Sequence, residues 1–349
     1  MSRIAISTPG RSWAGLGALA LLSAITTCGP SGDATEDGAA QGAATLPSET
    51  AQIPPDQEVR TADPYARGYT DDDFPRVQEL APGVFSYEQL RTAGEERFTT
   101  VSMFVVTGDG VLVADGQGSV EETRRLVQTI GGITDQPIRH VVIASDHGDH
   151  TAGNTAFPTD AAFYAHPTSE QNLARSAAQP NRPSDAPPVV MPTVLVEDRL
   201  ELDLGEKQIE ILFLGRAHTG GDLVVYLPEE KVLFMSEAYL HRVFPAMRSA
   251  YPTEWVAMLE RAQAMDVDTY VPGHGFVDAS PVLEAELEVY RQAVEQVVAE
   301  ATRLHGMGLT LEEALEQVDF GVLETWSLRD SQGARAIEQV YRELNGELP

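Results

Sequence analysis

Cysteine is almost absent from this sequence, because Cys28 is the only one among 349 residues. No disulfide can form within the chain, which excludes a small scaffold held together by disulfides. Lysine is nearly as rare, and only Lys207 and Lys231 are present. The 24 basic residues are outnumbered by 53 acidic ones, which gives a formal net charge of -29. A surface of this charge repels phosphate backbones, so we expect no nucleic-acid partner.

The first 28 residues have the pattern of a bacterial secretory leader. An apolar run at residues 14–24 is too short for a permanent membrane-spanning helix. The end of the leader, Ile25–Cys28, resembles a lipobox, in which the cysteine is lipidated, although Thr27 replaces the small residue usual before that cysteine. Either Cys28 is lipidated, or cleavage occurs near Ala24 and leaves no anchor. Both alternatives predict export, to the periplasm or as a lipoprotein of the outer membrane.

Three regions follow the leader. Residues 29–75 are rich in small and acidic residues, which predicts a flexible acidic tether. Residues 76–280 show strand and helix patterns and are expected to form the main domain. Residues 281–349 are mostly helical. An apolar stripe recurs in this C-terminal extension at helical spacing, formed by Leu283, Leu287, Tyr290 and Val294. Because such a stripe needs burial, the extension is expected to pack on the main domain.

Strands come first in the main domain, and helices then alternate with strands. The expected strands are 83–90, 100–107, 111–115, 138–144, 161–165, 223–227, 232–235 and 269–271, with further strands between 194 and 214. The expected helices are 121–130, 253–264 and one that begins near residue 168. This order fits an α/β fold in which two sheets pack face to face with helices on the outside. Periodicity alone does not distinguish this layout from other α/β arrangements.

A cluster of metal-binding side chains follows the apolar strand expected at 138–144. Asp146, His147, Asp149 and His150 lie within five residues. Imidazole and carboxylate groups are natural ligands for zinc and related divalent ions. The side chains at a strand end can converge outside the sheet, so the sequence predicts a metal site there.

This segment resembles the His-x-His-x-Asp-His signature of the metallo-β-lactamase superfamily. Further motifs follow the family order over about residues 78–290, namely Val113–Asp115, Gly215–Asp222, Leu233–Glu237 and Val271–Gly275. The resemblance implies a four-layer αββα sandwich, here with the C-terminal helical extension added. It also implies a metal-dependent hydrolase that acts on a small molecule. The combination of several motifs in order is much more specific than any one of them.

The resemblance also implies roles for individual residues. It places His147 and His218 in metal site one, Asp149, His150 and His274 in site two, Glu237 as the bridging carboxylate and Asp115 as support for the ligands. Ser145 stands where the family has a third histidine of site one, and Glu237 stands where it has aspartate. Asp146 is expected to point away from the metal unless it turns to assist. We therefore expect one tightly bound zinc and a second that is weak or absent, with iron or manganese as alternatives.

The stretch 239–251 corresponds to a pocket wall in superfamily members. Arg248 and Tyr251 are candidate substrate contacts, and Arg248 suits a substrate carboxylate. His241 is a candidate for either a substitute ligand or a pocket residue. The resemblance assigns Asp149 a second role, because it would hold the attacking water and pass a proton to the leaving group.

The leading functional hypothesis is hydrolysis of a cyclic amide, a lactone or another ester. One alternative is an envelope-tethered protein that binds metal or ligand without catalysis. A second alternative is a sulfatase or phosphodiesterase of the same fold.

Overall fold

The computed structural model describes residues 60–184 and 186–349. These residues belong to one compact unit, Pro54–Pro349. The leader, its cysteine Cys28 and the tether up to residue 59 lie outside the described residues.

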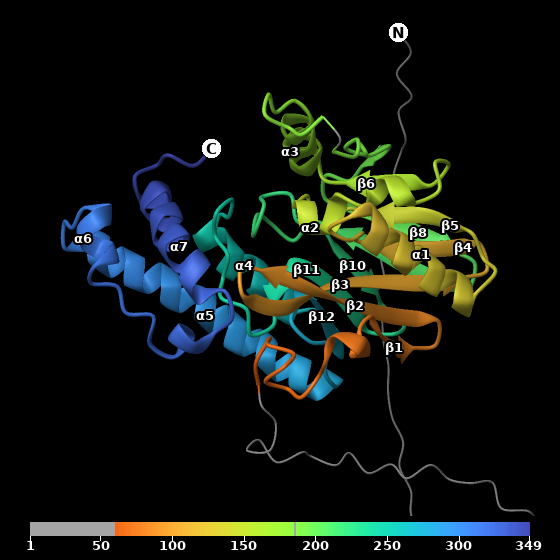
Figure 1. Cartoon of the computed structure of the whole chain (residues 1–349), viewed down its shortest axis with the longest axis horizontal. Helices are drawn as coiled ribbons and strands as arrows, with labels where there is room; N and C mark the ends of the chain where they lie inside the picture. Colours follow the sequence, from red (N-terminus) through yellow and green to blue (C-terminus); the bar gives the residue numbers. More distant parts are fainter. Residues whose placement is uncertain (1–59, 185) are drawn as a thin grey trace, which may run out of the picture. The chain divides into compact units, whose positions relative to one another are not determined.

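Twelve strands in the described part of the chain form one mixed sheet (Figure 1). They are β1 (Arg76–Ala81), β2 (Val84–Ala93), β3 (Glu96–Thr107), β4 (Gly110–Ala114), β5 (Ile138–Val142), β6 (Ala162–Ala165), β7 (Val194–Leu195), β8 (Arg199–Leu204), β9 (Lys207–Leu212), β10 (Val224–Leu227), β11 (Val232–Leu240) and β12 (Thr269–His274). The strand order is β7-β6-β5-β4-β3-β12-β11-β10-β9-β8, and β2 pairs with both β1 and β3.

The helices are α1 (Val120–Ile133), α2 (Gly148–Thr151), α3 (Pro167–Ala177), α4 (Pro252–Gln263), α5 (Ser280–Gly306), α6 (Leu311–Leu315) and α7 (Arg329–Leu344). Three short 3-10 helices are η1 (Asp71–Asp73), η2 (Asn154–Ala156) and η3 (Gly321–Thr325). The order of strands and helices expected from the sequence is present, with β1 and the short α2 in addition.

The sheet consists of two halves that meet at a single residue pair. β3 of the first half pairs with β12 of the second only through Thr100 and His274. Helix α1 packs Leu126 and Ile130 into an apolar cluster with β4, β5 and β6. Helices α4 and α5 pack into the larger core that β11 and β12 also enter. The predicted sandwich of two sheets with outer helices is therefore confirmed.

The C-terminal helices are part of the same core. Leu283, Leu287, Tyr290 and Val294 of α5 are all 0% exposed, so the stripe seen in the sequence is buried. Helix α5 contacts β12 and α4, and α7 contacts α5. The backbone N–H of Phe244 donates to the carbonyl of Ser327 at 2.9 Å, which joins the segment before α7 to the loop after β11.

Residues 60–75 do not behave as the tether that composition predicted. Arg67 makes an ion pair with Asp278 at 2.6 Å, and the Tyr69 ring stacks on Phe276 with centroids 5.2 Å apart. Ala62 is completely buried. These arginine and aromatic contacts outweigh the small-residue composition and place residues 60–75 on the folded unit.

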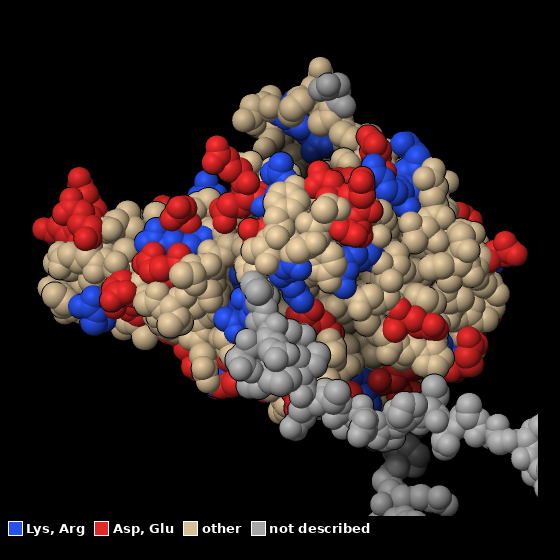
Figure 2. Space-filling view, turned by 60° about the horizontal axis from the view of Figure 1, so that its bottom comes forward, with Lys and Arg blue, Asp and Glu red and all other residues tan. Residues whose placement is uncertain are grey.

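None of the helices in residues 60–184 and 186–349 combines the length and apolarity that a bilayer crossing needs. On the face that Figure 2 shows, Lys and Arg side chains lie among Asp and Glu rather than in one continuous band.

Candidate metal centre

The six predicted ligands lie close together in the structure. They form two groups that share Glu237. The first group adds His147 and His218, and the second adds Asp149, His150 and His274. The ligand atoms within each group lie within 4.8 Å of one another. Helix α2, just after β5, carries Asp149 and His150, while Glu237 lies in β11 and His274 ends β12. The join between the sheet halves at His274 brings these strand ends together.

Short distances connect the members of the first group. His147 Nδ1 lies 3.0 Å from Glu237 Oε2, and His218 Nε2 lies 3.1 Å from Glu237 Oε1. The two imidazole nitrogens, His218 Nε2 and His147 Nδ1, are 3.0 Å apart. All three donor atoms therefore point at one small volume.

The second group is arranged in the same way. His274 Nε2 lies 3.3 Å from Asp149 Oδ2 and 3.3 Å from Glu237 Oε1. The Nε2 atoms of His150 and His274 are 3.4 Å apart. The second group thus offers four donor atoms, whereas the first group offers three.

These spacings fit a divalent cation. A tetrahedral zinc with bonds of about 2.0–2.1 Å holds its donors roughly 3.3–3.4 Å apart. His218 Nε2 and His147 Nδ1, 3.0 Å apart, are close enough for one ion to contact both. The donor set of imidazoles and carboxylates is also the set that zinc prefers.

Ser145 and Glu237, the two departures from the family signature, contact each other. The Ser145 hydroxyl donates a hydrogen bond to Glu237 Oε2. The same carboxylate reaches both histidines of the first group. The longer side chain of Glu237 therefore supplies a third donor beside His147 and His218, and Ser145 helps to hold it in place.

Outer contacts fix the ligand rings. His150 Nδ1 lies 3.0 Å from Asp115 Oδ2, and His274 Nδ1 donates to the carbonyl of Thr99 at 2.8 Å. Such contacts set the tautomer and aim the other ring nitrogen at the metal. Asp115 also accepts from Ser236 Oγ, and both residues have positive φ, +62° and +48°. This left-handed backbone costs about 1–2 kcal/mol per residue, a strain common at functional sites.

The charge distribution at the centre favours a cation. Burial opposes protonation of His274, but hydrogen bonds with Asp149 and Glu237 outweigh it and raise the pKa of His274 to about 10. Burial also opposes protonation of His147, and the Glu237 charge raises its pKa to about 9. Burial disfavours the Glu237 anion, yet the nearby histidines hold the pKa of Glu237 well below its usual value. Positive charge is stabilised here, whether a proton or a metal supplies it.

A cavity of about 230 Å³ opens beside these ligands, with His147, Asp149, His218, Glu237 and His274 in its lining. Arg248, a predicted substrate contact, also lines it. Sequence reasoning missed several further lining residues, among them Arg91, Leu328 and Gln332. Arg91 Nε lies 3.6 Å from Asp149 Oδ2. No motif marks these residues, because β2 and the start of α7 reach the site only through the fold.

Three other predicted residues lie elsewhere. Asp146 accepts a hydrogen bond from Asn172 Nδ2 at 2.8 Å and belongs to neither ligand group, as its expected orientation implied. Tyr251 lines an adjoining groove. The prediction that His241 is a substitute ligand or a pocket residue is wrong. Its Nδ1 donates to the Phe276 carbonyl at 2.7 Å, and its ring does not line the metal cavity. The backbone at Arg242 has φ +61°, so the chain turns just after β11. An extended strand through residue 241 would not predict this orientation of the ring.

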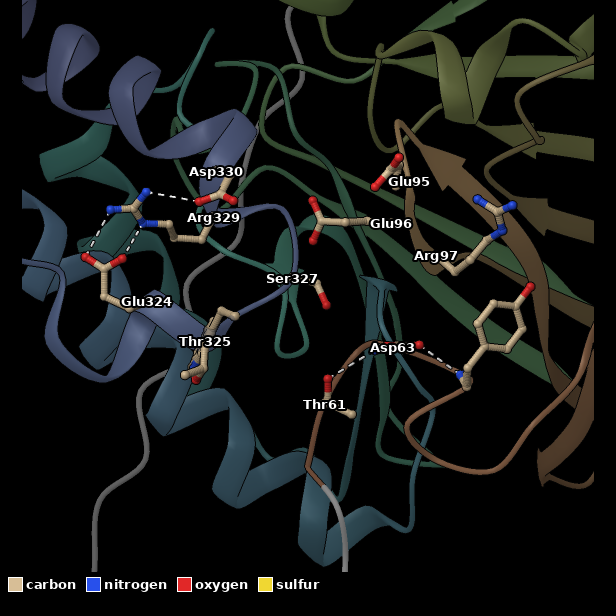
Figure 3. Close-up of a pocket in the computed structure, with 12 residues that line it drawn as sticks. Thr61, Asp63, Glu95, Glu96, Arg97, Glu324, Thr325, Ser327, Arg329 and Asp330 are labelled. Carbon is tan, nitrogen blue, oxygen red and sulfur yellow. Dashed lines mark hydrogen bonds and ion pairs between the residues drawn. The ribbon is translucent and has the colours of Figure 1, made fainter.

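A second cavity, of about 380 Å³, lies away from the ligands (Figure 3). Thr61 and Asp63, Glu95 and Glu96 of the β2–β3 turn, and Ser327 before α7 are among its lining residues. None of the six predicted metal ligands lines it.

A four-layer sandwich with a histidine and carboxylate centre at its strand ends defines a class of metal-binding αββα proteins. A family model described as the metallo-beta-lactamase superfamily matches residues 96–274. The metallo-beta-lactamase from Pontibacter korlensis has a similar fold, with a TM-score of 0.55 and 21% identity over 62% of this chain and 98% of that one. The chain belongs to the metallo-beta-lactamase superfamily, as the motifs predicted.

Relatives that are similar to this chain in sequence have different named activities. The chain is 26% identical over 191 residues to the 2,4-dinitroanisole O-demethylase subunit alpha of a Nocardioides species, covering 53% of this chain and 56% of that protein. It is 23% identical over 254 residues to the linear primary-alkylsulfatase of a Pseudomonas species, covering 60% of this chain and 48% of that protein. The chain thus spans about half the length of these two relatives.

Proposed function

We propose that this chain is a zinc-dependent hydrolase that cleaves a lactone, a cyclic amide or another ester. The observation that carries the proposal is the shared carboxylate of Glu237, which joins two groups of ligands at the wall of one open cavity. A metal-binding protein without catalysis needs neither the second group nor the cavity beside it.

Zinc in such a site lowers the pKa of the water it holds to about 7 and polarises the oxygen under attack. Asp149, whose side chain is 20% exposed, presents its carboxylate to the cavity and can hold the proton of the attacking water. It can then pass that proton to the leaving group. Arg91 Nε lies 3.6 Å from the same carboxylate and can help to orient it.

The two groups are not equal. Asp149, His150, Glu237 and His274 offer four donors, whereas His147 and His218 have only the shared Glu237 as a third. Three ligands are the usual set for a catalytic zinc, and a structural zinc usually has four. We therefore propose one tightly bound metal at the four-donor group and a second, weaker one at the three-donor group.

Metal content and hydrolysis test this function together. Purified protein loaded with zinc is analysed for bound metal and assayed on a panel of lactam, lactone and ester substrates. We expect more than one zinc per chain at saturation and turnover of at least one substrate class. His150→Ala should lose the tight metal and the turnover. Tight zinc binding with no turnover on the whole panel would instead support a binding protein.

Sulfate ester hydrolysis is a second candidate. It is favoured by two arginines, Arg91 and Arg248, in the lining of the cavity, because guanidinium groups bind sulfate oxygens well. The similarity to an alkylsulfatase points in the same direction. Release of inorganic sulfate from a primary alkyl sulfate, measured with the same protein, distinguishes this activity from carboxylic ester cleavage.

A further inference from the structure

We infer that the substrate extends to both sides of the metal centre, with an apolar group under the C-terminal extension and an anionic group in a groove beside α3. This inference rests on the proposed function, because it concerns the ligand of the same site. It names the chemical class of that ligand as an anionic amphiphile.

The apolar side is a wall built partly by the extension. Phe98, Leu240, Val243, Ala246 and Leu328 line the metal cavity together. Leu328 is 7% exposed and lies beyond residue 274, where the family match ends. A wall of this kind removes a hydrocarbon group of the ligand from water, and each buried methylene adds several-fold to affinity.

The position of Leu328 is fixed from two sides. Its backbone N–H donates to Glu96 Oε1 at 2.7 Å, which ties it to the start of β3. The preceding Ser327 is bridged to Val243 and accepts from the Phe244 N–H. Leu328 itself has φ +66°, so these contacts hold a strained residue in place. The apolar wall is therefore preorganised rather than formed by a loose end of the chain.

The polar side is a groove of about 510 Å³ next to the same centre. It shares His147 and Arg248 with the metal cavity, so a ligand can occupy both spaces at once. Its other walls include Arg175, Tyr251 and Asp146, whose carboxylate accepts a hydrogen bond from Asn172 of the same wall. These side chains suit a polar or anionic group and offer little to a hydrocarbon.

Arg248 lies at the junction of the two spaces. It is exposed and makes no hydrogen bond or ion pair with any of the residues that the structure describes. The chain has 53 acidic residues, yet none of those described pairs with this guanidinium. An arginine held free beside a reaction centre is suited to a carboxylate, sulfate or sulfonate of the ligand.

Binding of unreactive ligands tests this without relying on turnover. The probes are four aryl ethers, which the enzyme cannot hydrolyse: ethyl and octyl ethers of 3-carboxyphenol, and the same two ethers with hydroxymethyl in place of carboxyl. Their Kd values for zinc-loaded full-length protein are measured by calorimetry. We expect the octyl ether to bind at least tenfold more tightly than the ethyl ether. We also expect carboxyl to bind about tenfold more tightly than hydroxymethyl.

Two variants separate the two sides. Leu328→Ala should reduce the octyl-to-ethyl ratio severalfold and leave the carboxyl preference intact. Arg248→Met should remove the carboxyl preference and leave the octyl-to-ethyl ratio intact. Leu323→Ala, buried in the same extension but outside the cavity lining, and Arg124→Met, exposed on α1, are the matched controls and should change neither ratio.

The inference is overturned if the wild-type protein shows neither preference, or if Leu328→Ala weakens all four ethers equally. It is also overturned if the carboxyl preference survives in Arg248→Met and disappears only when the metal is removed, because the anion would then bind the metal. Absence of hydrolysis with both preferences present would contradict the proposed function alone.

Discussion

At the scale of single residues, Ser145 and Glu237 differ in opposite directions from the residues of the family signature. Ser145 is smaller than the histidine of the family signature, and Glu237 is one methylene longer than the aspartate. The hydroxyl of Ser145 donates to the carboxylate that contacts His147 and His218. The two departures therefore compensate for each other, and the first group keeps three donors.

This compensation predicts a paired effect on metal content. Ser145→Ala removes the hydrogen bond that holds Glu237, and we expect the weaker metal to bind about 10- to 100-fold less tightly, as is typical when an outer contact of a ligand is lost. The double variant Ser145→His with Glu237→Asp restores the family arrangement and should bind two metals. Zinc titration followed by mass spectrometry of the native protein measures both.

If Ser145→Ala binds both metals as the wild-type protein does, the hydroxyl has no part in positioning Glu237. Asn172→Ala, which removes a contact of Asp146 outside both ligand groups, is the control and should leave the metal content unchanged.

A second charged cluster predicts a pH effect away from the metal. Burial opposes ionisation of Glu286, but hydrogen bonds from His241 and Arg242 outweigh it and lower the pKa of Glu286 to about 2. A lowered pKa means that this carboxylate stabilises the fold above pH 4.5 and loses that effect as pH falls towards 2. We expect the free energy of unfolding of Glu286→Gln at pH 7 to be about 1–3 kcal/mol lower than that of the wild-type protein.

Urea denaturation at a series of pH values measures this difference. The gap between wild-type and Glu286→Gln protein should be constant from pH 7 to about 5 and should narrow below that. A gap that stays the same down to pH 3 would mean that the loss comes from packing rather than from charge. Glu284→Gln, an exposed change on the same helix, is the control.

At the scale of secondary-structure elements, the C-terminal extension belongs to the core and to the site. Helix α5 buries a full apolar stripe against β12 and α4. The segment before α7 supplies Leu328 to the metal cavity. A change in α5 should therefore affect the whole unit rather than a separate tail.

Leu287→Ala tests that statement. Leu287 is 0% exposed, and truncation of a buried leucine costs about 2–5 kcal/mol because it leaves a cavity. We expect one cooperative unfolding transition at a lower urea concentration than in the wild-type protein. Fluorescence and circular dichroism should both report the same transition. Leu344→Ala, at a position that is 41% exposed, should change stability by less than about 1 kcal/mol. Two separate transitions in the Leu287→Ala protein would show an independent tail.

At the scale of the whole molecule, the two sheet halves join at Thr100 and His274, next to the metal ligands. A metal held between His150, Glu237 and His274 would link α2, β11 and β12 beside this join. A ligand that binds the folded arrangement of these residues and not the unfolded chain stabilises the folded state. The metal is therefore expected to contribute to stability as well as to chemistry.

Removal of the metal should lower the melting temperature. A ligand present at 100 times its Kd stabilises the folded state by about 2.7 kcal/mol. For a folded unit that spans Pro54–Pro349, that corresponds to a Tm shift of roughly 4–5 °C. We expect dialysis against a chelator to lower Tm by this amount and added zinc to restore it, measured by calorimetry. The His150→Ala protein should respond far less, and an equal response there would place the stabilising metal elsewhere.

The sequence by itself determined the fold class and most of the candidate ligand set. His147, Asp149, His150, His218 and His274 occur in motifs whose order is specific, and the strands carry apolar runs long enough to be recognised. The buried stripe of α5 was also predictable, because helical spacing depends only on local periodicity.

Only the tertiary structure decided what lies around those ligands. Arg91, Leu328 and Gln332 reach the cavity from parts of the chain that are distant in sequence and carry no motif. His241 lies four residues from Glu237, but its ring faces Phe276 because the chain turns at Arg242. Whether Glu237 could replace a missing histidine depended on distances across the sheet join, which no one-dimensional pattern encodes. Long-range packing sets those distances, and it therefore decided the pocket while local sequence decided the ligands.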